Sequence, residues 1–201
     1  MRIVCLDLEG VLVPEIWITF SEATGIKELR RTTRDEPDYE KLMGFRISIL
    51  KERGLTLKDI QNVIGNMDVL PGAKEFVDEL RQRTQFVILS DTFEEFARPL
   101  MAKLGYPTLF CNSLAVDTNG MINGFHLRQK EGKMHVVAAF KRLNMSVFAA
   151  GDSFNDLAML REAHDSCLFR PPEAIKKSFP NIKTTETFEE LLAQIDRFLA
   201  K

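Results

Sequence analysis

The chain of 201 residues is long enough for one α/β domain with a sizeable insertion, or for two small domains. Apolar residues make up 45% and charged residues 28%, which can fill a globular core, and a net charge of −2 gives no electrostatic reason to expect nucleic acid or an anionic membrane as a partner. No apolar run approaches the roughly 18 residues of a membrane-spanning helix, and the N-terminus lacks a signal-peptide pattern. The three cysteines are each in or beside an apolar stretch and are expected to be buried thiols, which favours a reducing, cytoplasmic compartment.

Short apolar runs that alternate with amphipathic stretches predict an α/β fold with a parallel, doubly wound sheet. The expected strands are residues 3–6, 86–89, 109–111, 147–150 and 167–169. The expected helices between them are residues 73–83, 94–104, 134–143, 156–162, 173–178 and 188–199. Asn119-Gly120 predicts a hairpin turn within residues 114–127.

Residues 14–70 interrupt this alternation directly after the first strand. This segment holds no convincing strand and is expected to form several helices, including 39–53 and, behind a Thr56 N-cap, 57–66. Pro71-Gly72 marks the return to the sheet. We therefore predict a discontinuous core of residues 1–13 and 71–201, with a helical cap of residues 14–70 over the edge where the first strand ends.

Two of the expected strands end in acids. Asp7 and Glu9 follow the first strand, and Asp152 follows the strand 147–150. An Asp-x-Glu step after a first strand is, by itself, most often a solvated loop. However, the carboxyl ends of parallel strands share one edge of the sheet, where open α/β folds bind ligands. Magnesium prefers few carboxylates plus water and a phosphate, so Asp7 and Asp152 together predict a Mg²⁺ site.

Phosphoryl transfer needs a nucleophile, a cation, donors to the phosphate oxygens and an acid/base group. Asp7 could attack phosphorus and form an aspartyl phosphate. Glu9 lies two residues on, and in an extended chain it projects from the same face, so it could exchange the proton.

Three polar residues could complete such a site. Ser90 comes between the strand 86–89 and the next helix, where hydroxyl and N–H groups can bind phosphate, although alone it is more simply a helix cap. Lys133 closes a basic stretch that in isolation is more simply a solvated loop. Asn155 begins the helix after Asp152, where capping and a functional role are compatible.

These motifs occur in an order that resembles the haloacid dehalogenase superfamily of phosphatases. The four motifs of that superfamily match Asp7 with Glu9, Ser90, Lys133, and Asp152 with Asn155-Asp156. The resemblance covers essentially the whole chain and implies a Rossmann-like core with a cap. It also implies Mg²⁺ held by Asp7, Asp152 and the backbone carbonyl of Glu9, and a phosphate site that includes Ser90, the backbone of Asp91, Lys133 and Asn155.

Within this superfamily the chain most resembles the phosphoserine phosphatases. Their cap holds a Glu shortly after the first motif and an Arg on a later helix, which here fall at Glu15 and Arg46. An amino acid offers an ammonium and a carboxylate, and Arg suits a carboxylate through two parallel hydrogen bonds. Tyr39, Met43 and Arg46 share one helix face, although such a stripe alone is more often core packing.

Three positions depart from the phosphoserine phosphatase pattern. Glu9 stands where Asp is usual, Asp91-Thr92 where two glycines are usual, and Ser153 where a glycine is usual. Asp91 would have to turn its charge away from a bound phosphate. With these changes the chain is most similar to the ThrH family, whose members are described as phosphoserine phosphatases that can also pass the phosphoryl group to homoserine. An aspartyl phosphate can react with water or with any alcohol held in line.

Two other functions stay open. The chain could hydrolyse another small phosphomonoester, in which case Glu15 and Arg46 are ordinary cap charges. A receiver-type phospho-Asp signalling module combines similar residues, but it requires neither the helical insertion nor the motif at 151–156. A nucleotide-dependent kinase is disfavoured, because neither of the common glycine-rich phosphate-binding motifs occurs.

Overall fold

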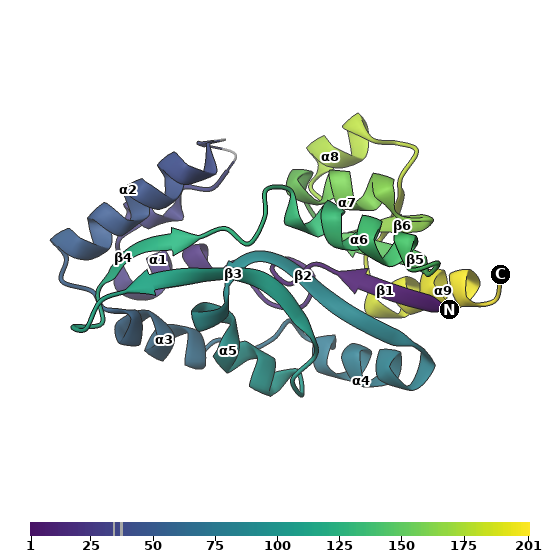
Figure 1. Cartoon of the computed structure of the whole chain (residues 1–201), viewed down its shortest axis with the longest axis horizontal. Helices are drawn as coiled ribbons and strands as arrows, with labels where there is room; N and C mark the ends of the chain where they lie inside the picture. Colours follow the sequence, from purple (N-terminus) through teal and green to yellow (C-terminus); the bar gives the residue numbers. More distant parts are fainter. Residues whose placement is uncertain (34, 37) are drawn as a thin grey trace.

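The computed structural model describes residues 1–33, 35–36 and 38–201. Within them, one seven-stranded sheet has the order β4-β3-β2-β1-β5-β6-β7 (Figure 1). The strands are β1 Arg2–Leu6, β2 Gln85–Phe93, β3 Leu109–Val116, β4 Ile122–His126, β5 Ser146–Gly151, β6 Asp165–Phe169 and β7 Lys183–Thr185. Neighbours pair in parallel except β3 and β4, which form the antiparallel hairpin expected around Asn119-Gly120. The predicted α/β class with a doubly wound, mostly parallel sheet is confirmed.

Helices cover both faces of the sheet. The helices are α4 Ala73–Arg83, α5 Glu94–Lys103 and α9 Phe188–Leu199 on one face, and α6 Gly132–Arg142, α7 Leu157–Glu162 and α8 Glu173–Ser178 on the other. Side chains of a strand alternate between faces, so Val4 and Leu6 enter the first apolar cluster whereas Ile3 and Cys5 enter the second. Continuous apolar runs such as residues 3–6 are therefore buried on both sides, as is usual for parallel sheets.

The segment between β1 and α4 is helical, as the sequence predicts. It contains α1 Ile16–Thr24, the short 3₁₀ helix η1 Lys27–Arg30, α2 Tyr39–Glu52 and α3 Leu57–Gly65. Thr56 caps α3 in a reciprocal capping box with Asp59. The backbone N–H of Leu57 donates to the carbonyl of Gly120 at 2.8 Å, which joins α3 to the β3–β4 hairpin. The first apolar cluster continues into these helices, and the division of the chain into core and cap stays a prediction.

β2 is longer than the sequence indicates. The prediction that the strand ends at residue 89 and that Ser90 stands at a helix entry is wrong, because β2 continues through Ser90, Asp91 and Thr92 to Phe93. The apolar run stops at Leu89 because the next residues are polar, yet they keep strand alternation, with Ser90 and Thr92 buried and Asp91 half-buried.

Other elements also differ from the expected bounds. Neither α1 nor β7 was given bounds from the sequence. α1 lies in the insertion, where helices were expected without a clear start for this one, and β7 is a three-residue edge strand of Lys and Thr. The helix after Asp152 starts with a 3₁₀ turn over Phe154–Asp156, and α7 begins at Leu157 rather than at Asp156.

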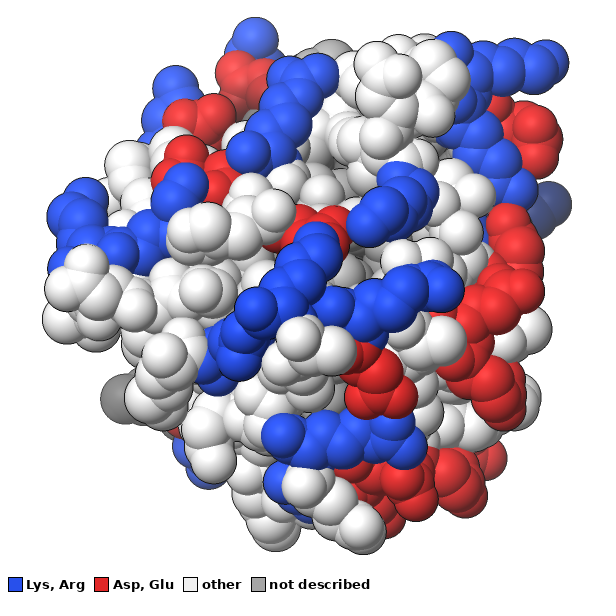
Figure 2. All heavy atoms as spheres, turned by 90° about the vertical axis from the view of Figure 1, so that its right-hand side faces the viewer, with Lys and Arg blue, Asp and Glu red and all other residues white. Residues whose placement is uncertain are grey.

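Surface charge is mixed on the face where the N-terminus and α9 lie. Figure 2 shows Lys and Arg side chains there interspersed with Asp and Glu, so neither sign covers that face. Among the described residues, no helix combines the length and the hydrophobicity that crossing a bilayer requires.

Candidate active site

Asp7 directly follows β1 at the carboxyl edge of the sheet. Its backbone N–H donates to the carbonyl of Ala150 at 2.9 Å, which continues the β1–β5 ladder and holds Asp7 beside the end of β5. Its buried carboxylate accepts from the N–H of Leu8 at 2.7 Å and lies 2.8 Å from Nζ of Lys133. Burial raises the pKa of Asp7, Asp156 and Asp152 add to the rise, and Lys133 opposes it.

Lys133, in the first turn of α6, is buried among carboxylates. Its Nζ lies 2.8 Å from Asp7 Oδ1, 2.8 Å from Asp156 Oδ1 and 3.7 Å from Asp91 Oδ2. Burial alone would lower the pKa of Lys133, but these three carboxylates outweigh it and raise the pKa well above its usual value. The ammonium therefore stays charged at a point that Asp7, Asp91 and Asp156 all approach.

Asp156 has a larger part in the site than its sequence position suggested. It is fully buried, and its Oδ2 accepts from the backbone N–H groups of Asp152 at 3.0 Å and Ser153 at 3.1 Å. Its other oxygen binds Lys133, so Asp156 orients both the lysine and the loop that carries Asp152. The sequence placed Asp156 only at the start of a helix. Its spacing of four residues from Asp152 was the one signal that could have indicated this larger role.

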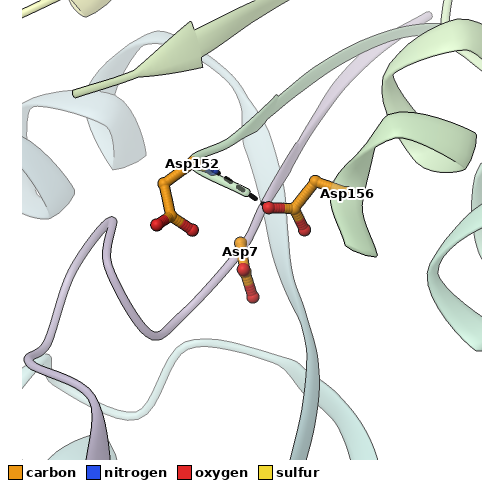
Figure 3. Close-up of side chains that lie close together, drawn as sticks. All are labelled: Asp7, Asp152 and Asp156. Atoms are coloured by element: carbon orange, nitrogen blue, oxygen red, sulfur yellow. Dashed lines mark hydrogen bonds between the residues drawn. The ribbon is translucent and has the colours of Figure 1, made fainter. Parts of the chain in front are cut away.

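Three acids from two segments, one after β1 and one after β5, surround one small space. Carboxylate oxygens of Asp7, Asp152 and Asp156 all lie within 4.8 Å of one another, as Figure 3 illustrates. Burial raises the pKa of Asp152 to about 7, and the charges of Asp156 and Glu15 add to the rise. Such a buried oxygen donor set, crowded with like charge, fits a small hard cation such as Mg²⁺.

Two glycines allow the backbone to pass close to these acids. Gly10 has a φ of +78°, and a Cβ added there would lie 2.5 Å from the carboxylate of Asp152. A Cβ added at Gly151 would lie 2.3 Å from Cγ of Asp156. The space that a larger residue would fill is thus already occupied by the carboxylates.

Glu9 lies in the same cavity as Asp7, although the chain bends at Leu8 instead of staying extended. Its Oε2 accepts from the N–H of Ile16 at 2.9 Å. Burial and the neighbouring Glu15 raise the pKa of Glu9 to about 7, while hydrogen bonds from Ile16 and Thr92 act in the opposite direction. A carboxyl with that pKa can both give and take a proton near neutral pH.

The end of β2 lines the cavity with Ser90, Asp91 and Thr92. The carbonyl of Asp91 accepts from the Tyr39 hydroxyl at 3.0 Å and from Asn112 Nδ2 at 3.0 Å. Its carboxylate accepts from Asn155 Nδ2 at 3.0 Å and lies 3.7 Å from Lys133 Nζ, so two partners hold this charge in the cavity lining. Thr92, which the sequence marked only as a residue in place of a usual glycine, contacts Glu9.

Arg46 lies in the same cavity, among residues of α1 and α2. The residue is 5% exposed; its guanidinium donates from Nη2 to the carbonyl of Arg31 at 2.7 Å and stacks 4.5 Å above the ring of Trp17. Among the described residues, Arg46 Nε is buried and has no hydrogen-bond partner. Burial lowers the pKa of Arg46 to about 10, and Tyr39, Glu9 and Glu15 oppose that shift. An unpaired buried donor costs about 1–3 kcal/mol, so this N–H is suited to an acceptor on a ligand.

A cavity of about 310 Å³ brings these groups together. Every predicted site residue lines it: Asp7, Glu9, Glu15, Arg46, Ser90, Asp91, Lys133, Asp152 and Asn155. A larger hollow of about 680 Å³ lies between α5 and β3 and contains none of these residues. The smaller cavity is the candidate site, because the buried charges converge there.

The sequence and the fold were compared with known proteins. The family described as haloacid dehalogenase-like hydrolase matches residues 6–161. The chain is 56% identical to the phosphoserine phosphatase ThrH of Pseudomonas aeruginosa, over 95% of the chain and 93% of that protein. It is 54% identical to a phosphoserine phosphatase of Pseudomonas syringae pv. tomato, over 95% of the chain and 81% of that protein.

Solved structures agree on the fold. The structure described as a phospho-aspartyl intermediate analogue of phosphoserine phosphatase superposes with a TM-score of 0.77 at 19% identity, covering 96% of this chain and 97% of the other. A substrate-bound phosphoserine phosphatase complex gives a TM-score of 0.76 at the same identity and coverage. The resemblance read from the motifs is confirmed: the chain belongs to the haloacid dehalogenase-like hydrolases and, within them, to the family of the curated ThrH protein.

Proposed function

We propose that the chain is a Mg²⁺-dependent phosphoserine phosphatase that works through an aspartyl phosphate on Asp7. The observation that carries this proposal is a single cavity of about 310 Å³, because it brings together groups for phosphoryl transfer and a group that can bind a substrate carboxylate. Asp7 and Lys133 provide a nucleophile and a cation, and Arg46 provides a buried N–H without a partner. The 56% identity to a protein named phosphoserine phosphatase ThrH supports the same substrate.

Asp7, Asp152 and the backbone carbonyl of Glu9 would hold Mg²⁺, with Asp156 completing the acidic cluster. When bound, the cation supplies positive charge that offsets the crowded carboxylates and the phosphate oxygens. Lys133 orients Asp7 through its 2.8 Å contact.

The proposed reaction has two steps. A carboxylate oxygen of Asp7 attacks phosphorus and the P–O bond to serine breaks, while Glu9 gives its proton to the departing serine oxygen. Glu9 then takes a proton from water, whose oxygen attacks the aspartyl phosphate and releases inorganic phosphate and free Asp7. Ser90, the backbone N–H of Asp91 and Lys133 bind the non-bridging oxygens in both steps.

Glu15 and Arg46 are proposed to bind the amino-acid half of the substrate. The substrate ammonium lies near the Glu15 carboxylate. The substrate carboxylate accepts a hydrogen bond from the Nε–H of Arg46. Arg46→Ala removes a charged hydrogen-bonding group worth about 1.5–3 kcal/mol. We expect kcat/KM for phosphoserine to fall about 10- to 150-fold, mainly through KM, while kcat/KM for an aryl phosphate changes little.

Steady-state assays of both esters with purified protein check this expectation. Arg98→Ala, which removes an exposed arginine paired with Glu94, is the matched control and should change neither ester. Equal losses for both esters in Arg46→Ala would favour a phosphatase for another small phosphomonoester.

We further propose transfer of the phosphoryl group to homoserine. An acceptor that attacks in line must enter from the side that serine has left, so it meets the same Glu15 and Arg46. Protein, Mg²⁺ and phosphoserine should be incubated with and without homoserine, with inorganic phosphate and phosphohomoserine quantified. A phosphohomoserine signal supports transfer; phosphate alone supports hydrolysis only, and a stable phospho-Asp without turnover would indicate a receiver-type module.

Two further expectations belong to this proposal. Residues 14–70 would act as a cap over the cavity, since they supply Glu15, Tyr39 and Arg46. The three cysteines are free thiols, two of them buried, which favours the reducing cytoplasm as the place of action.

A further inference from the structure

Trp17 is the single tryptophan of the chain and lies beneath Arg46. Its side chain is 8% exposed and stands edge-to-face with Phe20 at 6.4 Å and with Phe96 at 5.5 Å, measured between ring centroids. Phe96 belongs to α5, whereas Arg46 belongs to α2. Trp17 therefore connects the guanidinium to a helix that packs directly on the sheet.

Three contacts fix the plane of that guanidinium. Trp17 supports its flat face with Cζ 4.5 Å from the ring centroid, and indole is the side chain that attracts a stacked cation most strongly. Arg46 Nη2 is held by the carbonyl of Arg31 at 2.7 Å, and Nη1 faces the sulfur of Met43 at 3.7 Å. These contacts leave the Nε of Arg46 without a hydrogen-bond partner in the described part of the chain.

We propose that Trp17 is the positioning residue that determines whether the site selects a carboxylate. By fixing the plane of Arg46, it presents the Nε edge to the α-carboxylate of the substrate. This inference rests on the proposed function and deepens it, because it assigns carboxylate selection to a residue that need not touch the reacting atoms.

Phosphoserine and phosphoethanolamine test the inference, since they differ only in the carboxylate. The measured quantity is the ratio of kcat/KM for phosphoserine to that for phosphoethanolamine. Trp17→Leu should lower this ratio about 3- to 30-fold, which is the range expected for losing a desolvated cation–π contact. The fall should come from a higher KM for phosphoserine. Trp17→Phe keeps an aromatic face and should restore most of the ratio.

Two controls separate positioning from general damage. Phe76→Leu removes a buried ring of α4 that stacks on Phe188 and does not line the cavity, so it should lower stability but leave the ratio unchanged. In an Arg46→Ala background, Trp17→Leu should produce no further change in the ratio. Equal losses for both esters, or a further fall in that background, would overturn the inference.

Fluorescence gives a readout that needs no Trp17 variant. In Asp7→Asn protein, which cannot form the aspartyl phosphate, emission of the single tryptophan should change on phosphoserine binding and much less on phosphoethanolamine binding at equal occupancy. An identical response to both, or none to phosphoserine at saturation, contradicts the inference.

Wild-type protein that fails to hydrolyse phosphoserine would overturn the proposed function itself, whereas active protein with an unchanged ratio in Trp17→Leu overturns only the role of Trp17.

Discussion

Gly10 is where the turn after β1 passes closest to Asp152. Its φ of +78° and the 2.5 Å between an added Cβ and the Asp152 carboxylate predict two separate effects of Gly10→Ala. The left-handed backbone costs about 1–2 kcal/mol, and the displaced carboxylate should weaken Mg²⁺ activation about 10- to 100-fold. Urea unfolding and Mg²⁺ titration of the activity measure the two effects.

Gly25 offers a matched control for this substitution. It has a φ of +71° but nothing lies within 4 Å of an added Cβ. Gly25→Ala should therefore lose similar stability and keep the Mg²⁺ dependence of the wild type. A shifted Mg²⁺ dependence in both variants would mean that backbone strain, and not the contact with Asp152, controls the site.

At the scale of elements, α3 depends on its N-terminal cap. Thr56 and Asp59 exchange hydrogen bonds in the capping box, and the neighbouring Leu57 binds the hairpin through Gly120. Thr56→Ala should lower the free energy of unfolding by about 1 kcal/mol, because it removes the hydroxyl that accepts from the backbone N–H of Asp59. Urea denaturation measures this loss.

Thr24→Ala is the control within the same segment. The Thr24 hydroxyl donates to the carbonyl of Phe20 inside α1, a bond that duplicates the helix's own pairing. We expect a change of less than about 0.5 kcal/mol. Equal losses in the two variants would show that the capping box contributes nothing specific.

For the whole molecule, we expect the acidic cluster to link stability to the bound cation. A ligand that binds only the folded state stabilises it by about 2.7 kcal/mol at a concentration of 100 Kd, which corresponds to roughly 5–10 °C for a chain of this length. Mg²⁺ should therefore raise the thermal midpoint, and EDTA should reverse the rise. Differential scanning calorimetry with and without Mg²⁺ checks this expectation.

Two acid-to-amide variants locate the effect. Asp152→Asn should abolish most of the rise, because it removes one of the three clustered carboxylates. Asp165→Asn should preserve it, since Asp165 lies at the opposite end of the strands and pairs with Lys183 and Lys201. A thermal rise that survives Asp152→Asn would place the stabilising cation elsewhere.

Much of this architecture is readable from the sequence, because buried parallel strands are apolar runs and the site residues follow them. Asp7 and Asp152 were predicted because each comes after such an apolar run. The signal fails where strands stop being apolar: the end of β2 turns polar as it enters the site, and β7 is a short polar edge strand. The contact of Asp156 with Lys133 was not predicted for a related reason: the two residues are 23 positions apart, and only the fold brings them together.

The charges around the cavity have a kinetic consequence. Among the described residues, five acids and two basic residues line it: Asp7, Glu9, Glu15, Asp91 and Asp152, and Lys133 and Arg46. At a pH where these acids are ionised, a phosphate dianion that arrives first meets a surplus of like charge, whereas a divalent cation is attracted. We therefore predict an ordered addition in which Mg²⁺ binds before the ester. Substrate affinity should accordingly rise with Mg²⁺ concentration, and isotope trapping of phosphoserine should succeed only in protein that has already been loaded with Mg²⁺.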